Sequence, residues 1–184
     1  MRFGNYFFYR LFSSMFFGFS TGSVFVIYEP LNPSIYSLGG ILLAAGMMIV
    51  ASQYKKLMNL HALFAVLFIV EIVTLGIVLT FLALGKSLLS ALIIYICYQI
   101  TFLFGNYVIR VETVVLEDTK LYSLLDISKQ AGYLLGLGGA FIYYRIVEIS
   151  GILDKIAQVY FLHYILIVLQ CVVLFLLITS RKKI

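Results

Sequence analysis

The stretch that decides the fold runs from Gly105 to Gly139 and reads GNYVIRVETVVLEDTKLYSLLDISKQAGYLLGLGG. It lies between two long hydrophobic segments. Of the 21 formal charges in the chain (13 Lys and Arg, 8 Asp and Glu), seven fall within these 35 residues: Arg110, Glu112, Glu117, Asp118, Lys120, Asp126 and Lys129. Charges clustered beside lipid-soluble sequence are expensive unless they are paired. The stretch therefore predicts a charged connection between two membrane helices.

The composition predicts an all-α membrane protein. Hydrophobic residues make up 63% of the chain, charged residues 11%, and the mean hydropathy is +1.08. Globular proteins are nearer ~45–50% apolar and ~25% charged. Fourteen glycines, two prolines and no repeated alternation of polar and apolar residues favour helices over a barrel. At about 20 residues a span, we expect one domain over residues 1–184 with six helices at 6–28, 34–51, 61–84, 88–110, 121–144 and 156–179.

Several functional classes do not fit this sequence. The net charge of +5 comes from residues at predicted helix ends and forms no basic groove, so we expect no nucleic-acid partner. Cys97 and Cys171 lie in separate apolar segments, and His61 and His163 should lie near different membrane faces. We therefore expect no metal, cofactor or catalytic residue. The Gly-x-Ser-x-Gly match at 18–22 lies within a predicted membrane helix, where a nucleophile elbow cannot form.

The distribution of basic residues predicts that both termini are cytoplasmic. The first connection, at 29–33, holds both prolines and no basic residue, as a short outer turn would. With this turn outside, ten basic residues lie on the cytoplasmic side of the membrane, and three, Lys86, Arg145 and Lys155, lie on the outer side. The inside set is Arg2, Arg10, Lys55, Lys56, Arg110, Lys120, Lys129, Arg181, Lys182 and Lys183.

Small residues recur at helical spacing in the first and fifth predicted spans. Such spacing places them on one helix face and allows a second helix to approach closely. We expect helix packing at Gly18, Gly22, Gly132, Gly136 and Gly139.

Charged residues within or beside the spans are candidates for coupling or gating. Glu71 falls near the centre of the third span, where a lone carboxylate costs about 2.5–3.5 kcal/mol. Asp126 and Lys129 can pair with each other, and Arg110 or Glu112 on the preceding helix could complete a network. The alternatives are a hydrogen-bonded packing residue for Glu71 and a solvated helix end for the others.

Polar side chains also occupy the first and fourth spans. Tyr95, Gln99 and Asn106 fall on one helical face and are predicted to face a polar cavity. A hydrogen bond between helices would satisfy Gln99 equally well. Ser20 and Thr21 can line a polar path or bond their own backbone carbonyls, and we favour backbone bonding for most of these hydroxyls.

Two parts of the sequence resemble the major facilitator superfamily. The segments RLFSSMFFG (10–18) and GGILLA (39–44) resemble its first two helices. The stretch from Arg110-Val-Glu112 through KLYS (120–123) to GYLLGLGG (132–139) resembles its fourth helix, inner loop and glycine-rich fifth helix. The loop ASQYKKLMN (51–59) keeps only the basic character of the family's second-to-third-helix motif. The similarity extends over nearly the whole chain, which corresponds to half of a typical twelve-helix member.

This resemblance implies a half-size secondary transporter in the bacterial cytoplasmic (inner) membrane. Two copies, or one copy and a different half-transporter chain, would rebuild the whole architecture around a path for a small solute, with membrane lipid around them. Helices one and four would line that path. The substrate-facing residues would be Ser14, Ser20, Thr21, Tyr95, Gln99 and Asn106.

Two other functions remain open from the sequence. A six-helix membrane subunit could capture a ligand and dock on a separate ATP-driven module. A non-transporting assembly protein would use the same polar residues only to hold helices together.

Overall fold

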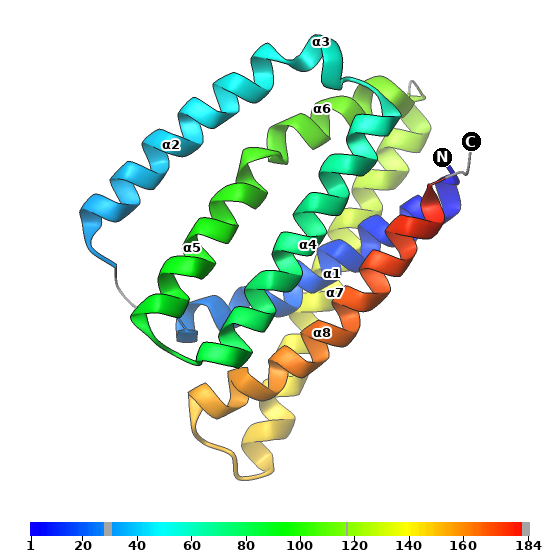
Figure 1. Ribbon diagram of the computed structural model, residues 1–184. Helices are drawn as coiled ribbons and strands as arrows, with labels where there is room; N and C mark the ends of the chain where they lie inside the picture. The colour runs from blue at the N-terminus through cyan, green and yellow to red at the C-terminus, as the bar shows by residue number, and fades with distance from the viewer. Residues whose placement is uncertain (28–30, 117, 182–184) are drawn as a thin grey trace.

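The computed structural model describes residues 1–27, 31–116 and 118–181, and over these residues the chain is helical with no strand. The all-α prediction is confirmed. The helices are α1 (Phe3–Ile27), α2 (Pro33–Ser52), α3 (Tyr54–Leu57), α4 (Leu60–Leu84), α5 (Leu88–Leu103), α6 (Gly105–Leu116), α7 (Thr119–Ile149) and α8 (Lys155–Ser180) (Figure 1).

The bounds of the six predicted spans agree with helices of the structure except in two places. That all six cross a membrane, with both termini cytoplasmic, stays a prediction. The fourth span, predicted over 88–110, is divided: α5 ends at Leu103, and α6 begins at Gly105 and continues to Leu116. Glycine at the junction is a usual site for such a break. The fifth helix is longer than the predicted 121–144. The predicted end of the first span, Tyr28, and the tail residues Lys182 and Lys183 lie outside the described residues.

Four helices are long and apolar enough to cross a membrane. They are α2, α4, the joined α5 and α6, and α8. The architecture is therefore compatible with a membrane protein, as the composition predicts. Helices α1 and α7 are not among the four, and α7 carries five charged residues: Lys120, Asp126, Lys129, Arg145 and Glu148.

Polar side chains cap the helices at their N-terminal ends. Asn32, Asn59, Asp118 and Asp154 each accept a hydrogen bond from a backbone N–H in the first turn of the helix that follows. Ser87 does so in a capping box with Ser90. These bonds satisfy donors that the first turn leaves free. They explain why α2, α4, α5, α7 and α8 begin where they do.

The helices pack in an ordered way around α1 and α4. Helix α1 lies against α7 and α8, helix α5 lies against α2 and α4, and α4 also packs against α8. Both ends of the described chain lie at the same end of the bundle (Figure 1). There the Arg2 N–H donates to the Ser180 carbonyl at 2.9 Å. Helix α2 lies on the outside and has no buried residue.

Glycines bring α1 and α7 into backbone contact. A Cβ added at Gly132 would meet the carbonyl oxygen of Leu11, and one added at Gly136 would meet that of Met15. A Cβ at Gly18 would lie 2.9 Å from the Gly136 Cα. Both helices therefore need glycine at these positions, because any side chain would push the backbones apart.

The other two predicted packing glycines differ from these three. A Cβ at Gly139 would meet the ring of Phe19, so the obstacle there is a side chain. At Gly22 the nearest atom is a ring carbon of Tyr144 at 3.6 Å, which is ordinary contact. The close approach is thus concentrated at Gly18, Gly132 and Gly136.

Candidate functional site

A buried ion network joins α1, α6 and α7. Its centre is Glu112, whose side chain is fully buried. Arg10 Nε lies 2.9 Å from Glu112 Oε1, and Lys129 Nζ lies 2.9 Å from Oε2. Lys129 also pairs with Asp126 at 3.0 Å, and the Tyr6 hydroxyl donates to Glu112 Oε1 at 2.5 Å. The buried carboxylate is thereby neutralised by two cations from different helices, as burial of a charge requires.

This network unites three of the four charged residues singled out around the connection at 105–139. Glu112, Asp126 and Lys129 come together, and Asp126 and Lys129 pair across one helical turn. Arg110 lies elsewhere: it is exposed, with its guanidinium 6.0 Å from the ring centre of Tyr54. The gating role of all four residues stays a prediction.

A second buried carboxylate lies at Glu71 in α4. Its Oε1 accepts hydrogen bonds from the Tyr9 hydroxyl at 2.7 Å and the Ser13 hydroxyl at 3.1 Å. From α8, Gln170 Nε2 donates to Glu71 Oε2 at 2.8 Å and to the Glu71 carbonyl oxygen at 2.9 Å. Glu71 therefore connects α4 to α1 and α8 through neutral donors only.

The two carboxylates are linked by adjacent tyrosines. The rings of Tyr6 and Tyr9 are both completely buried, and their centres are 5.5 Å apart. One hydroxyl binds Glu112 and the other binds Glu71. Movement of α1 would therefore disturb both carboxylates together.

A cavity of about 550 Å³ lies between α1, α4, the α5–α6 pair and α7. This is within the usual size range of small-molecule sites. Its polar lining comes from all four sides of the cavity: Tyr9, Arg10, Ser13, Glu71, Thr101, Tyr122, Asp126, Lys129 and Gln130. Both charged clusters thus border one space.

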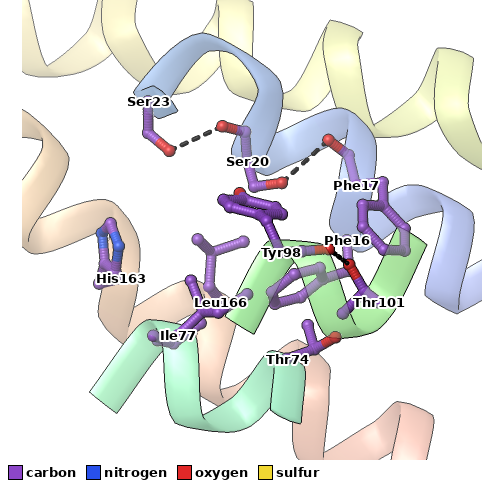
Figure 2. A pocket seen from close by; sticks show the side chains of 11 residues that line it. Phe16, Phe17, Ser20, Ser23, Thr74, Ile77, Tyr98, Thr101, His163 and Leu166 are labelled. Carbon is purple, nitrogen blue, oxygen red and sulfur yellow. Dashed lines mark hydrogen bonds between the residues drawn. The ribbon is translucent and has the colours of Figure 1, made fainter. Parts of the chain in front are cut away.

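A second, much smaller chamber adjoins this cavity. It has a volume of about 20 Å³, which is enough for one water molecule. Figure 2 shows Ser20 and Ser23 of α1, Thr74 of α4, Thr101 of α5 and His163 of α8 around it. Thr101 also lines the large cavity, as does Phe17. These two side chains therefore belong to the walls of both spaces.

Residues predicted to face substrate in the first helix lie in different surroundings. Ser20 and Thr21 both donate to the Phe17 carbonyl, at 3.0 and 2.7 Å, as the preference for backbone bonding predicts. Ser20 lines the small chamber, and Thr21 lies 3.3 Å from the Tyr133 hydroxyl. Ser14 is half-buried. Their role in a substrate path stays a prediction.

The polar face of the fourth span turns toward α2. The Tyr95 hydroxyl donates to the Tyr36 carbonyl at 3.2 Å, and Asn106 Nδ2 lies 3.8 Å from the sulfur of Met47. Gln99 Oε1 is buried and has no hydrogen-bond partner in the described part of the chain. None of the three lines the 550 Å³ cavity. Their substrate-facing role also stays a prediction.

Sequence reasoning did not single out the residues of α1 and α8 that complete the site. Arg10 was assigned only to a helix flank, although an arginine between Tyr9 and Ser13 in an apolar helix is itself a signal for a buried partner. Gln170 is an equally isolated amide within an apolar helix. Their partners, Glu112 of α6 and Glu71 of α4, lie far away in the sequence, so the sequence alone does not pair them.

The described residues contain no group of three or more His, Cys, Asp and Glu side chains placed to hold a metal ion. Comparisons of the chain with protein-family models, with curated proteins and with solved structures find no match.

Proposed function

We propose that the protein is a half-size secondary transporter. Two copies would associate in the membrane and move a small solute by alternating access, as the resemblance to the major facilitator superfamily implies. The observation that carries this proposal is the cavity of about 550 Å³, in which charged and polar side chains from four helices meet inside an apolar bundle.

The packing of the helices supports the proposal. The chain divides into two sets of three long helices, and α1, α2 and α4 of the first set correspond to α5, α7 and α8 of the second. Exchanging the two sets keeps the main contacts. The contacts of α1 with α7 and α8 become those of α5 with α2 and α4, and the contact of α4 with α8 is kept. Three-helix repeats of this kind are nested within each half of such transporters.

The outer position of α2 supports assembly from two chains. Helix α2 has no buried residue and exposes a row of apolar side chains: Leu38, Ile41, Leu42, Met48 and Ile49. An even number of spans puts both ends of each chain on one side of the membrane, so two copies with the same orientation can stand side by side as the two halves of such transporters do. Their cavities would then face each other across the dimer axis.

The ion network supplies a gate in this proposal. Arg10, Glu112 and Lys129 tie the N-terminal part of α1 to α6 and α7, and α1 begins at the end of the bundle that holds the chain termini (Figure 1). Opening the cavity at this end would separate charges that neutralise one another. A solute that stabilises the open form would offset that cost.

The test is counterflow in reconstituted vesicles. Vesicles are preloaded with one solute class at a time (amines, amino acids, sugars, carboxylates), and the trace labelled solute is added outside. Transient accumulation with one class, reduced by Lys129→Met and unchanged by Lys155→Met in the exposed first turn of α8, is the expected result. No accumulation with any class would contradict the proposal.

A further inference from the structure

The charges of the cavity wall and of the ion network behind it do not balance. Arg10 and Lys129 on the wall carry two positive charges. Glu71 and Asp126 on the wall, together with Glu112 behind it, carry three negative charges. Within the network, the two cations match Glu112 and Asp126. One negative charge, that of Glu71, is left over.

Glu71 has no ion-pair partner within the described residues. Its three side-chain hydrogen bonds come from Tyr9, Ser13 and Gln170, all of them neutral. A further acceptor lies beside it, because Gln170 is completely buried and its Oε1 has no partner in the described chain. A buried carboxylate without a cation beside it is stabilised by a positive charge, and a buried amide oxygen without a donor is costly.

Aromatic side chains form much of the remaining wall. Tyr9, Phe17, Phe102, Phe104 and Tyr122 line the same cavity as Glu71. The faces of such rings attract ammonium and other organic cations, and cages of aromatic residues are used to hold quaternary ammonium groups. A wall of this kind beside one uncompensated carboxylate fits a cation with an apolar body.

We propose that Glu71 binds the positive charge of a monovalent organic cation whose apolar body fills the aromatic part of the cavity. That this cation is the transported solute rests on the proposed function. The binding site itself does not depend on transport or on the number of chains.

The test uses a pair of ions of the same shape and opposite charge. Binding of radiolabelled tetraphenylphosphonium to the purified full-length protein in detergent is measured by equilibrium dialysis, with tetraphenylborate as the matched anion. We expect saturable binding of the phosphonium and none of the borate. Equal binding of both ions, or binding of neither ion, would overturn the proposal. A Glu71 side chain that takes up a proton and no organic cation would give one of these two results.

Two variants separate the site from general electrostatics. Glu71→Gln keeps the shape and removes the charge, and it should weaken phosphonium binding about tenfold or more, as loss of a buried charge partner does. Glu148→Gln removes a negative charge that is paired with Arg145 on the exposed surface and does not line the cavity, and it should keep the affinity within about threefold. Equal loss in both variants would overturn the assignment to Glu71.

A measurement on the unaltered protein covers the case in which Glu71→Gln does not fold. A hydrophobic carbodiimide modifies buried carboxyl groups, and the modified peptide is mapped by mass spectrometry. Tetraphenylphosphonium should slow modification of Glu71, whereas tetraphenylborate should not. Modification of Glu71 that is indifferent to the phosphonium would overturn the proposal.

The results also distinguish this proposal from the function on which it rests. Phosphonium binding at Glu71 without counterflow of any solute would support the cation site and contradict the proposed transport. Counterflow of a neutral or anionic solute without phosphonium binding would support the proposed transport and contradict the cation site.

Discussion

The ammonium group of Lys129 lies 2.9 Å from the Glu112 carboxylate, which α6 carries into the interior of the bundle. The other oxygen of this carboxylate faces Arg10 of α1, also at 2.9 Å. One buried anion is thus held between cations from two neighbouring helices. The stability of this arrangement and its capacity to open depend on the same contacts.

Removal of the central charge should destabilise the fold strongly. Glu112→Gln leaves Arg10 and Lys129 partly buried with only Asp126 to neutralise them, and breaking a buried pair in this way costs about 3–5 kcal/mol. The loss is measured as the free energy of unfolding in mixed micelles. Glu148→Gln, which breaks the exposed pair with Arg145, is the control and should cost about 0–1 kcal/mol. Equal losses would show that the network does not hold the bundle.

The glycine contact between α1 and α7 can be tested by comparing two glycines of the same helix, Gly136 and Gly138. In Gly136→Ala the new methyl group would overlap the Met15 carbonyl, and we expect a loss of about 1–3 kcal/mol. Gly138→Ala has open space around it and should be neutral or stabilising by up to about 1 kcal/mol, because alanine favours the helix. Thermal unfolding of the two variants in the same detergent compares them. A milder effect at position 136 than at 138 would contradict the described packing.

Much of this packing could be predicted from the sequence, because it depends on spacing along one helix. The four- and three-residue spacing of Gly132, Gly136 and Gly139 is a local property. The pairing of Asp126 with Lys129 is local too. Hydrophobic length likewise predicts helices close to those observed. Local periodicity fails where the helix breaks, between Leu103 and Gly105, and it also ends α7 too early.

The partners of the buried charges could not be predicted in this way. Arg10 and Glu112 are 102 residues apart, and nothing in either segment specifies the other. Helical spacing places Tyr95 and Asn106 on one face, but it does not say which neighbour that face meets. In the structure the neighbour is α2, whereas the cavity is lined by Glu71 and the charged turn of α7.

The hydrogen bond between Tyr9 and Glu71 should contribute measurably to stability. Tyr9→Phe removes one of the donors to a buried carboxylate, which costs about 1–3 kcal/mol. Tyr122→Phe is the control, because Tyr122 lines the same cavity without a hydrogen bond to its hydroxyl in the described structure. Chemical unfolding curves of both variants make the comparison. A Tyr9→Phe protein as stable as the parent would show that Glu71 does not need this donor.

Loss of Lys129 should shift the cavity toward its open form. In a protein whose two cysteines, Cys97 and Cys171, are replaced by alanine, Gln130→Cys places one thiol on the cavity wall. Adding Lys129→Met removes a tie between α6 and α7, so a membrane-impermeant maleimide should label this thiol several-fold faster. Labelling of Ile149→Cys, at the exposed end of α7, should not change. An unchanged rate at position 130 would argue against a gate at this network.

The central claim is that two copies of this chain form one transporter, and the mass of the purified protein with its lipid retained tests it most directly. Native mass spectrometry from lipid nanodiscs should give a species containing two chains of 20.8 kDa. An Ile41→Arg change on the exposed face of α2 should convert it to one chain, because a charge placed in an apolar interface opposes association. A single chain in the unaltered protein would contradict the account.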